Sequence, residues 1–348
     1  MTPESREEAV LDAVATRREL VNDAIDEELT MGSPERLYEA SRMLLEAGGK
    51  RLRPATVLLV AEALTDTDPL SADYRAFPDL EGGTVDVMSA AASVEIIHSF
   101  TLIHDDIMDD DDMRRGVPAV HREYDDATAI LAGDTLYSKA FEIILDTEAP
   151  PERALEAAKL LAATCTSICE GQAMDVEFEH QPDVLPEEYL GMIELKTAVL
   201  YAAAAAIPAL VVGADEETVE ALRGYGLCVG KAFQIQDDVL DLTVPSEQLG
   251  KQRGSDLVEG KRTIITLHAI EQGVDVEGLL DATDPENVTE DEVDAAVETL
   301  REAGSIDFAR EKAEELVAEG QAHLDELPDN EARTRLKQLA DYLIERGY

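Results

Sequence analysis

The sequence predicts an all-α protein that folds as one large helical domain over residues 1–348. Apolar residues recur at three- and four-residue spacing in nearly every segment, which is the period of a helix with one buried face. The tripeptides TPE (2–4) and SPE (33–35) favour a capped helix start with proline at the first helical position. No stretch has the composition of a linker, so a division into separate domains is not expected.

Helices are expected over most of the chain, and the loops carry much of the proline, glycine and aspartate. The expected ranges are 4–29, 34–46, 52–64, 84–109, 119–146, 152–180, 187–212, 216–243, 262–272, 290–302, 305–325 and 329–346. The segments 66–83 and 273–289 are expected to lie on the surface. The uncharged run 197–214 is shorter than the roughly 20 strongly apolar residues of a membrane-spanning helix, so a buried core helix is expected there and no membrane span.

Acidic residues dominate the charge. The 348 residues include 76 Asp and Glu against 29 Lys and Arg, a formal net charge of −47, while 45% of residues are hydrophobic and suffice for a packed core. Such self-repulsion is relieved at high salt, where the Debye length is about 3 Å at 1 M, and it argues against a nucleic-acid partner. We interpret the chain as a cytoplasmic protein of a salt-accumulating halophile. Its charged start, MTPESREEAV, is not expected to be a signal peptide.

The three cysteines, Cys165, Cys169 and Cys228, do not indicate a disulfide framework. Cys165 and Cys169 are one helical turn apart, but the sequence offers no second ligand pair near them. Both are therefore interpreted as core thiols.

Two aspartate clusters stand out against the acidic background, because each ends an apolar segment. The members are Asp105, Asp106 and Asp109 after SFTLIH, and Asp237, Asp238 and Asp241 after KAFQIQ. In both clusters the first and last aspartates are four residues apart and share a helix face. Two such clusters facing one cavity would repel each other without a cation between them. Mg²⁺ takes oxygen ligands and bridges to substrate phosphates, so the clusters predict a magnesium site.

Several of the few basic residues lie in polar stretches that contain glycine or threonine. They are Lys50, Arg51, Arg53, Arg114, Arg115, Lys196, Lys251 and Lys261. Lysine binds phosphate as a point charge and arginine as a bidentate fork. In GGKRLRP (48–54) these charges precede a helix expected to start near Pro54, and a helix N-terminus favours anions. The pattern predicts a substrate with diphosphate groups, one held by Mg²⁺ and another by Lys and Arg, beside an apolar cavity.

These motifs resemble those of the trans-isoprenyl diphosphate synthases, the family of farnesyl and geranylgeranyl diphosphate synthases, and in particular the haloarchaeal geranylgeranyl enzymes. The resemblance runs from about residue 37 to about residue 266. It rests on GGKRLRP (48–54), IIHSFTLIHDDIMDDDDMRRG (96–116), GQAMDV (171–176), ELKTAVLY (194–201), KAFQIQDDVLD (231–241) and GKQRGSDLVEGKRT (250–263). A lone DDxxD motif is a weak signal, whereas this ordered series is specific. The resemblance implies a helical bundle around a central apolar active-site cavity.

The resemblance also implies roles for the matching residues. Asp105 and Asp109 would bind two Mg²⁺ ions with Asp106 in support, and Asp237 would hold a third, with Asp238 and Asp241 beside it. Asp241 is also a candidate metal ligand. Candidate ligands of the allylic diphosphate are Arg114, Lys196, Thr197, Gln234, Lys251 and Lys261. Candidate ligands of isopentenyl diphosphate are Lys50, Arg53, His98 and Arg115, with Arg51 a weaker one. The expected catalytic residues are Asp105, Asp106, Asp109, Arg114, Lys196, Asp237 and Lys251.

The reaction implied by the resemblance needs no side-chain general base. The allylic C–O bond breaks, and Mg²⁺ with Lys and Arg stabilises the departing pyrophosphate. The double bond of isopentenyl diphosphate then attacks the allylic cation head to tail. Pyrophosphate itself takes the proton that is lost, and the apolar cavity excludes water that would quench the cation.

Residues just before Asp105 are expected to set the product length. Phe100 stands five positions before Asp105 and the smaller Thr101 four positions before, which resembles the archaeal geranylgeranyl enzymes. Ile97 and Ser93 lie one and two turns further back. The expected product is geranylgeranyl diphosphate for isoprenoid and ether-lipid biosynthesis.

Other functions stay open on the sequence. A farnesyl or longer-chain polyprenyl diphosphate synthase would be expected to differ in the residues just before Asp105 that set the product length. A terpene cyclase would not need GGKRLRP, and a non-catalytic acidic helical subunit would be expected to lose one aspartate motif. The family resemblance further implies a homodimer, in which the Ala-rich run 198–206 could permit close helix packing.

Overall fold

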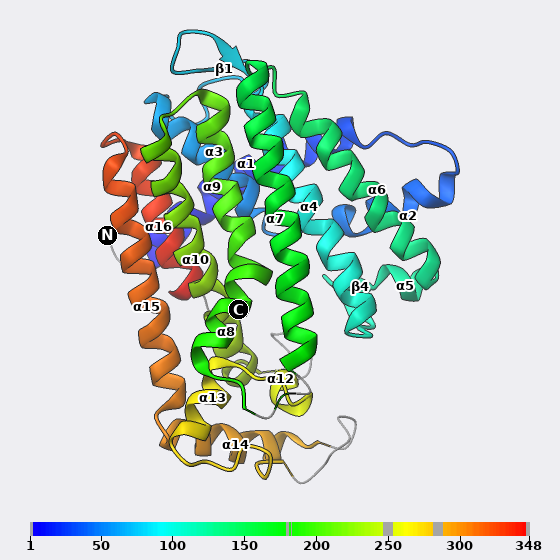
Figure 1. Ribbon diagram of the computed structural model, residues 1–348, viewed down its shortest axis with the longest axis vertical. Coiled ribbons are helices and arrows are strands. Elements are labelled where there is room, and N and C mark those ends of the chain that lie inside the picture. Colours follow the sequence, from blue (N-terminus) through cyan, green and yellow to red (C-terminus); the bar gives the residue numbers. More distant parts are fainter. Residues whose placement is uncertain (1–2, 179–180, 182, 246–252, 281–287, 346–348) are drawn as a thin grey trace. The chain divides into compact units, whose positions relative to one another are not determined.

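The computed structural model describes residues 3–178, 181, 183–245, 253–280 and 288–345, and these are mostly helical with two short hairpins (Figure 1). The all-α class is confirmed. The main helices are α1 (Pro3–Glu28), α2 (Glu35–Glu46), α3 (Leu52–Thr65), α4 (Val87–Met108), α5 (Val120–Glu123), α6 (Asp126–Leu145), α7 (Pro151–Phe178), α8 (Pro186–Ile193), α9 (Val199–Val212), α10 (Glu216–Thr243), α12 (Ser255–Val258), α13 (Ile264–Glu271), α14 (Glu290–Glu302), α15 (Ser305–His323) and α16 (Glu331–Glu345). A π-helical turn, η1 (Glu194–Ala198), joins α8 to α9, and a 3-10 turn, η3 (Leu324–Glu326), follows α15.

Most predicted helices are confirmed to within a few residues, but two are interrupted. The predicted helix 119–146 breaks between α5 and α6, because the Asp125 carboxylate caps α6 by accepting a hydrogen bond from the Thr128 backbone N–H at 2.8 Å. The predicted helix 187–212 contains the turn η1. One predicted cap is wrong, because Pro34 is itself the extended N-cap of α2 and not its first helical residue. The predicted helix 52–64 is confirmed as α3, which begins at Leu52, two residues before the start near Pro54 expected from GGKRLRP.

The segment 66–83 is not simply a surface insertion. Strands β1 (Phe77–Pro78) and β2 (Thr84–Val85) pair antiparallel there, with Phe77 opposite Val85. Phe77 is 0% exposed, and Tyr74 is buried with its hydroxyl donating to the Glu62 carboxylate. The prediction is wrong for these anchors because two aromatic side chains tie a polar loop to the core.

Cys165 is buried as predicted, but Cys169 is exposed, so its interpretation as a core thiol is wrong. The buried positions of α7 follow helical spacing through Ala157, Leu161, Cys165 and Ile168, and Cys169 lies beside this stripe. Of the segment 273–289, residues 273–280 and 288–289 are described, and they are exposed or half-buried as expected.

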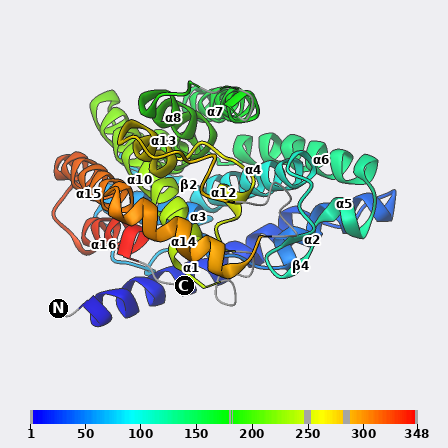
Figure 2. The ribbon, with the colours of Figure 1, turned by 90° about the horizontal axis from the view of Figure 1, so that it is seen from below.

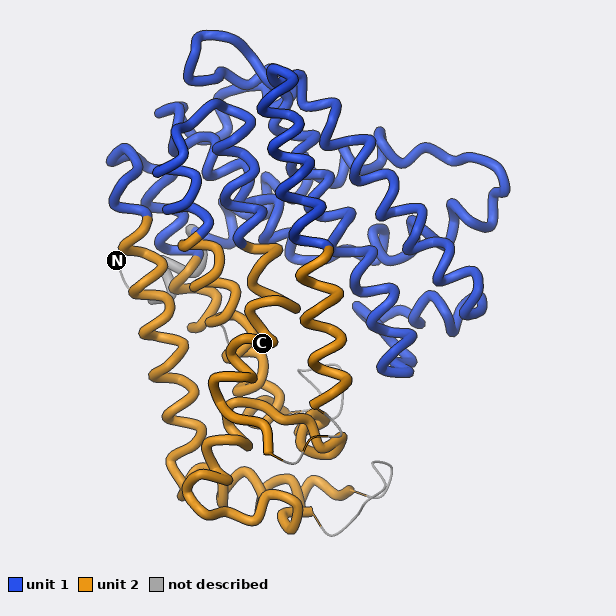
Figure 3. The backbone as a smooth tube through the Cα atoms, in the orientation of Figure 1, with its two compact units in different colours: residues 1–165, 202–223, 324–339 blue, residues 166–201, 224–323, 340–348 orange. Residues whose placement is uncertain are grey.

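The chain divides into two compact units, shown in different colours in Figure 3. The first comprises residues 1–165, 202–223 and 324–339, and in it α4 packs against α6, α3 and α1, with α4 and α6 side by side in Figures 1 and 2. The second comprises residues 166–201, 224–323 and 340–348, and in it α15 packs against α13 and α14. The expectation of one domain over residues 1–348 stays a prediction.

Two helical stretches are long and apolar enough to cross a membrane by length and composition, Val87–Met108 and Pro186–Val212. In each, 72% of the apolar window is buried inside the protein, as in the core helices of soluble proteins. The predicted buried helix at 197–214 is confirmed, since Ala202–Ala206 are at most 4% exposed within one chain. Because these alanines are already covered, the Ala-rich run is not a surface for a second subunit.

Candidate active site

The first aspartate cluster lies at the C-terminal end of α4, in the first unit. Asp105 and Asp109 are half-buried, and the backbone N–H of Asp109 donates to the Asp105 carbonyl at 2.9 Å, so helical geometry keeps both on one face. A helix C-terminus carries partial negative charge, which adds to that of the carboxylates. The end of α4 therefore favours a bound cation.

Asp106, between them, is buried and plays a different part. Its Oδ1 accepts a hydrogen bond from Arg114 Nε at 2.6 Å, and burial raises the pKa of its carboxyl to about 6 against the opposing effect of Arg114. Its buried Oδ2 has no hydrogen-bond partner among the described residues. Carboxylate oxygens of this kind fit a hard divalent cation, which Asp105 and Asp109 would hold with Asp106 in support.

The two arginines that follow the cluster belong to a tight hairpin. Strands β3 (Met113–Arg114) and β4 (Val117–Pro118) pair antiparallel, and the two turn residues Arg115 and Gly116 have φ of 53° and 78°. Positive φ at both positions is the mark of a type I′ turn, which fits the twist of paired strands. The hairpin therefore fixes Arg114 and Arg115 relative to each other.

Arg115 contacts the GGKRLRP loop, which carries Lys50 and Arg53. These two residues and His98 of α4 were expected, with Arg115, to bind isopentenyl diphosphate. Arg115 Nη1 donates to the Gly48 and Leu44 carbonyls at 2.5 and 3.1 Å. Gly49 has φ of 145°, and a Cβ there would stand 2.9 Å from Arg115 Cζ, so glycine lets the guanidinium lie against the loop. Burial and the neighbouring arginines lower the pKa of Arg115, although Glu95 opposes this. The cluster is thus an electropositive site suited to an anion.

Arg51 differs from its neighbours. It is 3% exposed, its Nη1 pairs with Glu95 Oε1 at 2.5 Å, and it holds a left-handed φ of 51° ahead of α3. Such a backbone costs on the order of 1–3 kcal/mol and persists where the surrounding contacts require it. Arg51 therefore secures the loop, whereas Lys50 is exposed and Arg53 half-buried.

His98 on α4 completes this basic cluster. Its Nε2 lies 3.2 Å from Arg53 Nη1. Burial, followed by the charges of Arg53, Arg115, Arg51 and Arg114, lowers the pKa of His98 well below 6.5. The imidazole is therefore neutral at neutral pH and can accept a hydrogen bond from Arg53.

We expect His98 to make the protein less stable in acid. Below about pH 6.5 the unfolded histidine takes up a proton that the folded one refuses, so stability falls as pH falls, by up to about 1.4 kcal/mol per pH unit until the folded pKa is reached. Urea unfolding in molar KCl from pH 7 to 5 should show a shallower decline for His98→Gln than for the wild type. Parallel curves for the two proteins would contradict this prediction.

In the second unit, the turn η1 positions Lys196 and Thr197. Lys196 Nζ pairs with Asp175 Oδ2 of α7 at 2.6 Å, and Thr197 Oγ1 donates to Gln234 Oε1 of α10 at 2.9 Å. A Cβ on Gly171 would lie 2.3 Å from Lys196 N, and one on Gly230 would lie 2.5 Å from Ala198 Cα. Glycines on both neighbouring helices therefore admit the wider π-helical backbone, a feature often found at functional sites.

The second aspartate cluster is built into a hydrogen-bond network on α10. Asp237 is half-buried, whereas Asp238 is buried and accepts hydrogen bonds from the Tyr189 hydroxyl and from Gln234 Nε2, the latter at 3.2 Å. Burial raises the pKa of Asp238 well above its usual value. Asp241 accepts from Ser255 Oγ at 2.8 Å, which ties the end of α10 to the start of α12.

Lys261 follows α12 and pairs with Glu259 at 2.8 Å. The expected site residue Lys251 lies outside the described residues. Each unit thus brings together its own part of the expected site: the first holds the Asp105 cluster and the Lys50–Arg53–His98–Arg115 set, and the second holds Lys196, Thr197, Gln234, Lys261 and the Asp237 cluster.

The sequence reasoning missed residues that hold the site in place. Asp175 and Gly171 belong to GQAMDV, whose residues were given no role, and Tyr189 precedes ELKTAVLY. The motif GQAMDV could have pointed to Asp175 and Gly171. No sequence pattern pointed to Tyr189, because its partner Asp238 is far away in sequence.

Comparison of the sequence with known proteins identifies the family of this chain. Residues 34–300 match the family described as Polyprenyl synthetase. The chain belongs to the polyprenyl synthetase family. It is 68% identical over 336 residues to the geranylfarnesyl diphosphate synthase of Natronomonas pharaonis, covering 97% of both chains. It is 50% identical to the geranylgeranyl diphosphate synthase of Methanosarcina mazei, covering 97% of this chain and 98% of that protein.

The fold agrees with this membership. The structure of the geranylgeranyl pyrophosphate synthetase of Geoglobus acetivorans superposes with a TM-score of 0.85 at 43% identity, over 96% of this chain and 99% of that one. As a polyprenyl synthetase, the chain is a prenyl diphosphate synthase, a trans-prenyltransferase of a magnesium-dependent family that acts on isopentenyl and allylic diphosphates. The family resemblance expected from the motifs is confirmed.

Proposed function

We propose that this prenyl diphosphate synthase makes geranylgeranyl diphosphate, adding isopentenyl diphosphate to dimethylallyl, geranyl and farnesyl diphosphate. The proposal rests on Phe100, whose ring meets those of His104 and Tyr137 with centroids 4.9 and 5.3 Å away. His104 is itself held: its Nε2 lies 3.1 Å from the Ile130 carbonyl, and a Cβ on Gly133 would lie 2.3 Å from that nitrogen. The Phe100 ring is thus held in place by contacts with His104 and Tyr137.

Residues further back on α4 support the same length limit. Ile97 and Ser93 are 0% exposed, and Ser93 Oγ donates to the Ala140 carbonyl of α6 at 2.8 Å. Thr101 Oγ1 donates to the His98 carbonyl of its own helix at 2.8 Å. A growing chain that passed Phe100 would have to displace packed side chains, which is costly in a dense core.

The proposed division of labour follows the two sets of charges. Three bound Mg²⁺ ions would neutralise the charge of the diphosphate leaving group. Their proposed ligands are Asp105, Asp109 and Asp237, and Asp241 is a further candidate. Arg114, Lys196, Thr197, Gln234, Lys251 and Lys261 would orient the allylic diphosphate. Lys50, Arg53, His98 and Arg115 would hold isopentenyl diphosphate, with His98 accepting a hydrogen bond from Arg53.

Phe100→Ala is expected to lengthen the product by at least one isoprene unit, because it removes the braced ring and leaves space in front of Ile97. Chromatography of the dephosphorylated alcohols measures this. Phe308→Ala, which removes a ring stacked on His268 in the second unit, is the matched control and should keep the wild-type product. An unchanged distribution in Phe100→Ala would remove the basis of the length assignment.

Geranylfarnesyl diphosphate is the second candidate product, because the Natronomonas pharaonis relative at 68% identity carries that name. Incubation with Mg²⁺, labelled isopentenyl diphosphate and each of the three allylic starters in molar KCl separates the two. Geranylgeraniol as the end point from every starter supports the proposal. Geranylfarnesol at high isopentenyl diphosphate supports the alternative, and a cyclised hydrocarbon contradicts both.

We also propose a cytoplasmic homodimer in a halophile that uses the product for isoprenoid and ether-lipid biosynthesis. The net charge of −47 supports the halophile. Three large apolar residues of α6 are 45–56% exposed, namely Ile130, Leu131 and Leu145, and a second subunit that covered them would gain from their burial. Light scattering in molar KCl tests the dimer, and the monomer mass at micromolar concentration would contradict it.

A further inference from the structure

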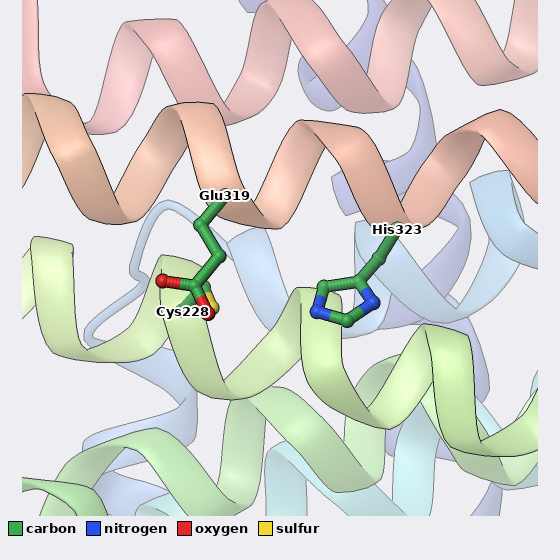
Figure 4. A group of neighbouring side chains, drawn as sticks. All are labelled: Cys228, Glu319 and His323. Atoms are coloured by element: carbon green, nitrogen blue, oxygen red, sulfur yellow. The ribbon is translucent and has the colours of Figure 1, made fainter.

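Three side chains with different metal-binding atoms meet between α10 and α15, within the second unit. Cys228 Sγ, one carboxylate oxygen of Glu319 and one ring nitrogen of His323 lie within 4.8 Å of one another (Figure 4). Glu319 and His323 are four residues apart and share a face of α15, which presents them together toward Cys228 on α10. None of the three belongs to the aspartate clusters or the basic sets that bind substrate.

Glycines allow the two helices to approach closely at this point. A Cβ on Gly224, one turn before Cys228, would lie 2.7 Å from His323 Nε2, so the imidazole occupies space that any side chain would fill. On α15, a Cβ on Gly320 would lie 3.2 Å from Cys228 Cβ. Gly224 of α10 therefore lies against His323 of α15, and Gly320 of α15 lies against Cys228 of α10. The cluster lies where the two helices pack closely.

We propose that Cys228, Glu319 and His323 bind a transition-metal dication of the Zn²⁺ type, with a fourth position open to water. Sulfur, nitrogen and oxygen ligands in a set of three suit Zn²⁺ and related ions, whereas Mg²⁺ takes oxygen ligands. The ligand atoms of a tetrahedral site with bonds of about 2.0–2.3 Å lie roughly 3.3–3.8 Å apart, so separations of up to 4.8 Å need contract by no more than about 1.5 Å. Glu319 is exposed and free to supply much of this movement by a change of rotamer.

The charge balance also suits a dication. Cys228 is 6% exposed. Burial, with Glu319 nearby, raises the pKa of its thiol to about 11, so a bound ion displaces the thiol proton into solvent. The thiolate and the carboxylate then neutralise the two charges of the ion. The bound ion would fasten α10, which carries Gln234 and Asp237, to α15.

Cobalt(II) provides the test, because a thiolate ligand gives Co²⁺ a strong charge-transfer absorption in the near ultraviolet that oxygen ligands do not. The full-length protein, stripped with EDTA and kept reduced in molar KCl with excess Mg²⁺, is titrated with CoCl₂ and then with ZnCl₂. We expect the absorption to saturate at one Co²⁺ per chain and to vanish on addition of Zn²⁺. No such absorption at millimolar Co²⁺ would overturn the proposal.

Substitutions identify the ligands. Cys228→Ser should abolish the absorption, and His323→Gln should weaken Co²⁺ binding at least about 100-fold while keeping the thiolate band at high Co²⁺. Cys169→Ser, which removes the exposed thiol of α7, is the matched control and should titrate like the wild type. A band lost in Cys169→Ser but kept in Cys228→Ser would overturn the assignment, as would unchanged affinity in His323→Gln. Circular dichroism and prenyltransferase turnover of the metal-free variants establish that each is folded.

Discussion

Asp105→Asn is expected to reduce turnover on the order of a thousandfold, because it removes a charge from the cluster proposed to hold the Mg²⁺ that stabilises the leaving diphosphate. The substitution keeps the shape of the side chain, and Asp105 is only half-buried at the end of α4, so the fold should be preserved. Single-turnover assays with geranyl diphosphate at saturating Mg²⁺ measure the chemical step directly. The melting temperature in molar KCl should change little.

Asp112→Asn is the matched control within the same acidic stretch. The Asp112 side chain is 81% exposed and pairs with Arg122, so its loss changes a solvated surface and not the face that Asp105 shares with Asp109. Turnover of this variant should stay within about twofold of the wild type. Equal losses in the two variants would mean that the stretch acts through its general charge, and the specific role of Asp105 would be wrong.

Gly171→Ala is expected to lower turnover about 100-fold and stability by about 1–3 kcal/mol, although alanine is the better helix former. The added Cβ would lie 2.3 Å from Lys196 N and 2.7 Å from Lys196 Cα, and backbone atoms cannot rotate away as a flexible side chain can. The turn η1 must shift or straighten, and Lys196 and Thr197 would move with it. Steady-state kinetics and urea unfolding measure the two effects.

Gly191→Ala gives a matched comparison on α8. A Cβ at Gly191 meets nothing within 4 Å, so this variant should be as stable as the wild type or slightly more stable, with normal turnover. A Gly171→Ala enzyme that kept full activity would show that the close approach of α7 is not needed to position Lys196.

The helices and both halves of the site could be predicted where local sequence determines them. Asp105 and Asp109 lie on one face because a helix places residues four apart together, and the apolar period of α4 already predicted that helix. The hairpin that holds Arg114 was missed because strands β3 and β4 are two residues long, too short for any period to be visible.

Features made by long-range contact could not be predicted. The turn η1 depends on Gly171 and Gly230, which belong to other helices, and ELKTA itself reads as ordinary helix. The Cys228 cluster could not be predicted either. The sequence neighbours of Cys228 offer no metal ligand, and Glu319 and His323 lie about 90 residues further along the chain, on α15. Each of these arrangements requires knowledge of which helices lie side by side.

The type I′ hairpin has a thermodynamic consequence. Arg114 donates a hydrogen bond to Asp106 of the aspartate cluster proposed to bind Mg²⁺, and the next residue, Arg115, donates to the Gly48 carbonyl of the loop proposed for isopentenyl diphosphate. The two-residue turn fixes the backbone from which both arginine side chains extend, so a displacement of that backbone at Arg115 would also displace Arg114. An anion that moved the turn together with Arg115 would also shift the Arg114–Asp106 pair. In that case linkage requires each diphosphate to change the affinity for the other by the same factor.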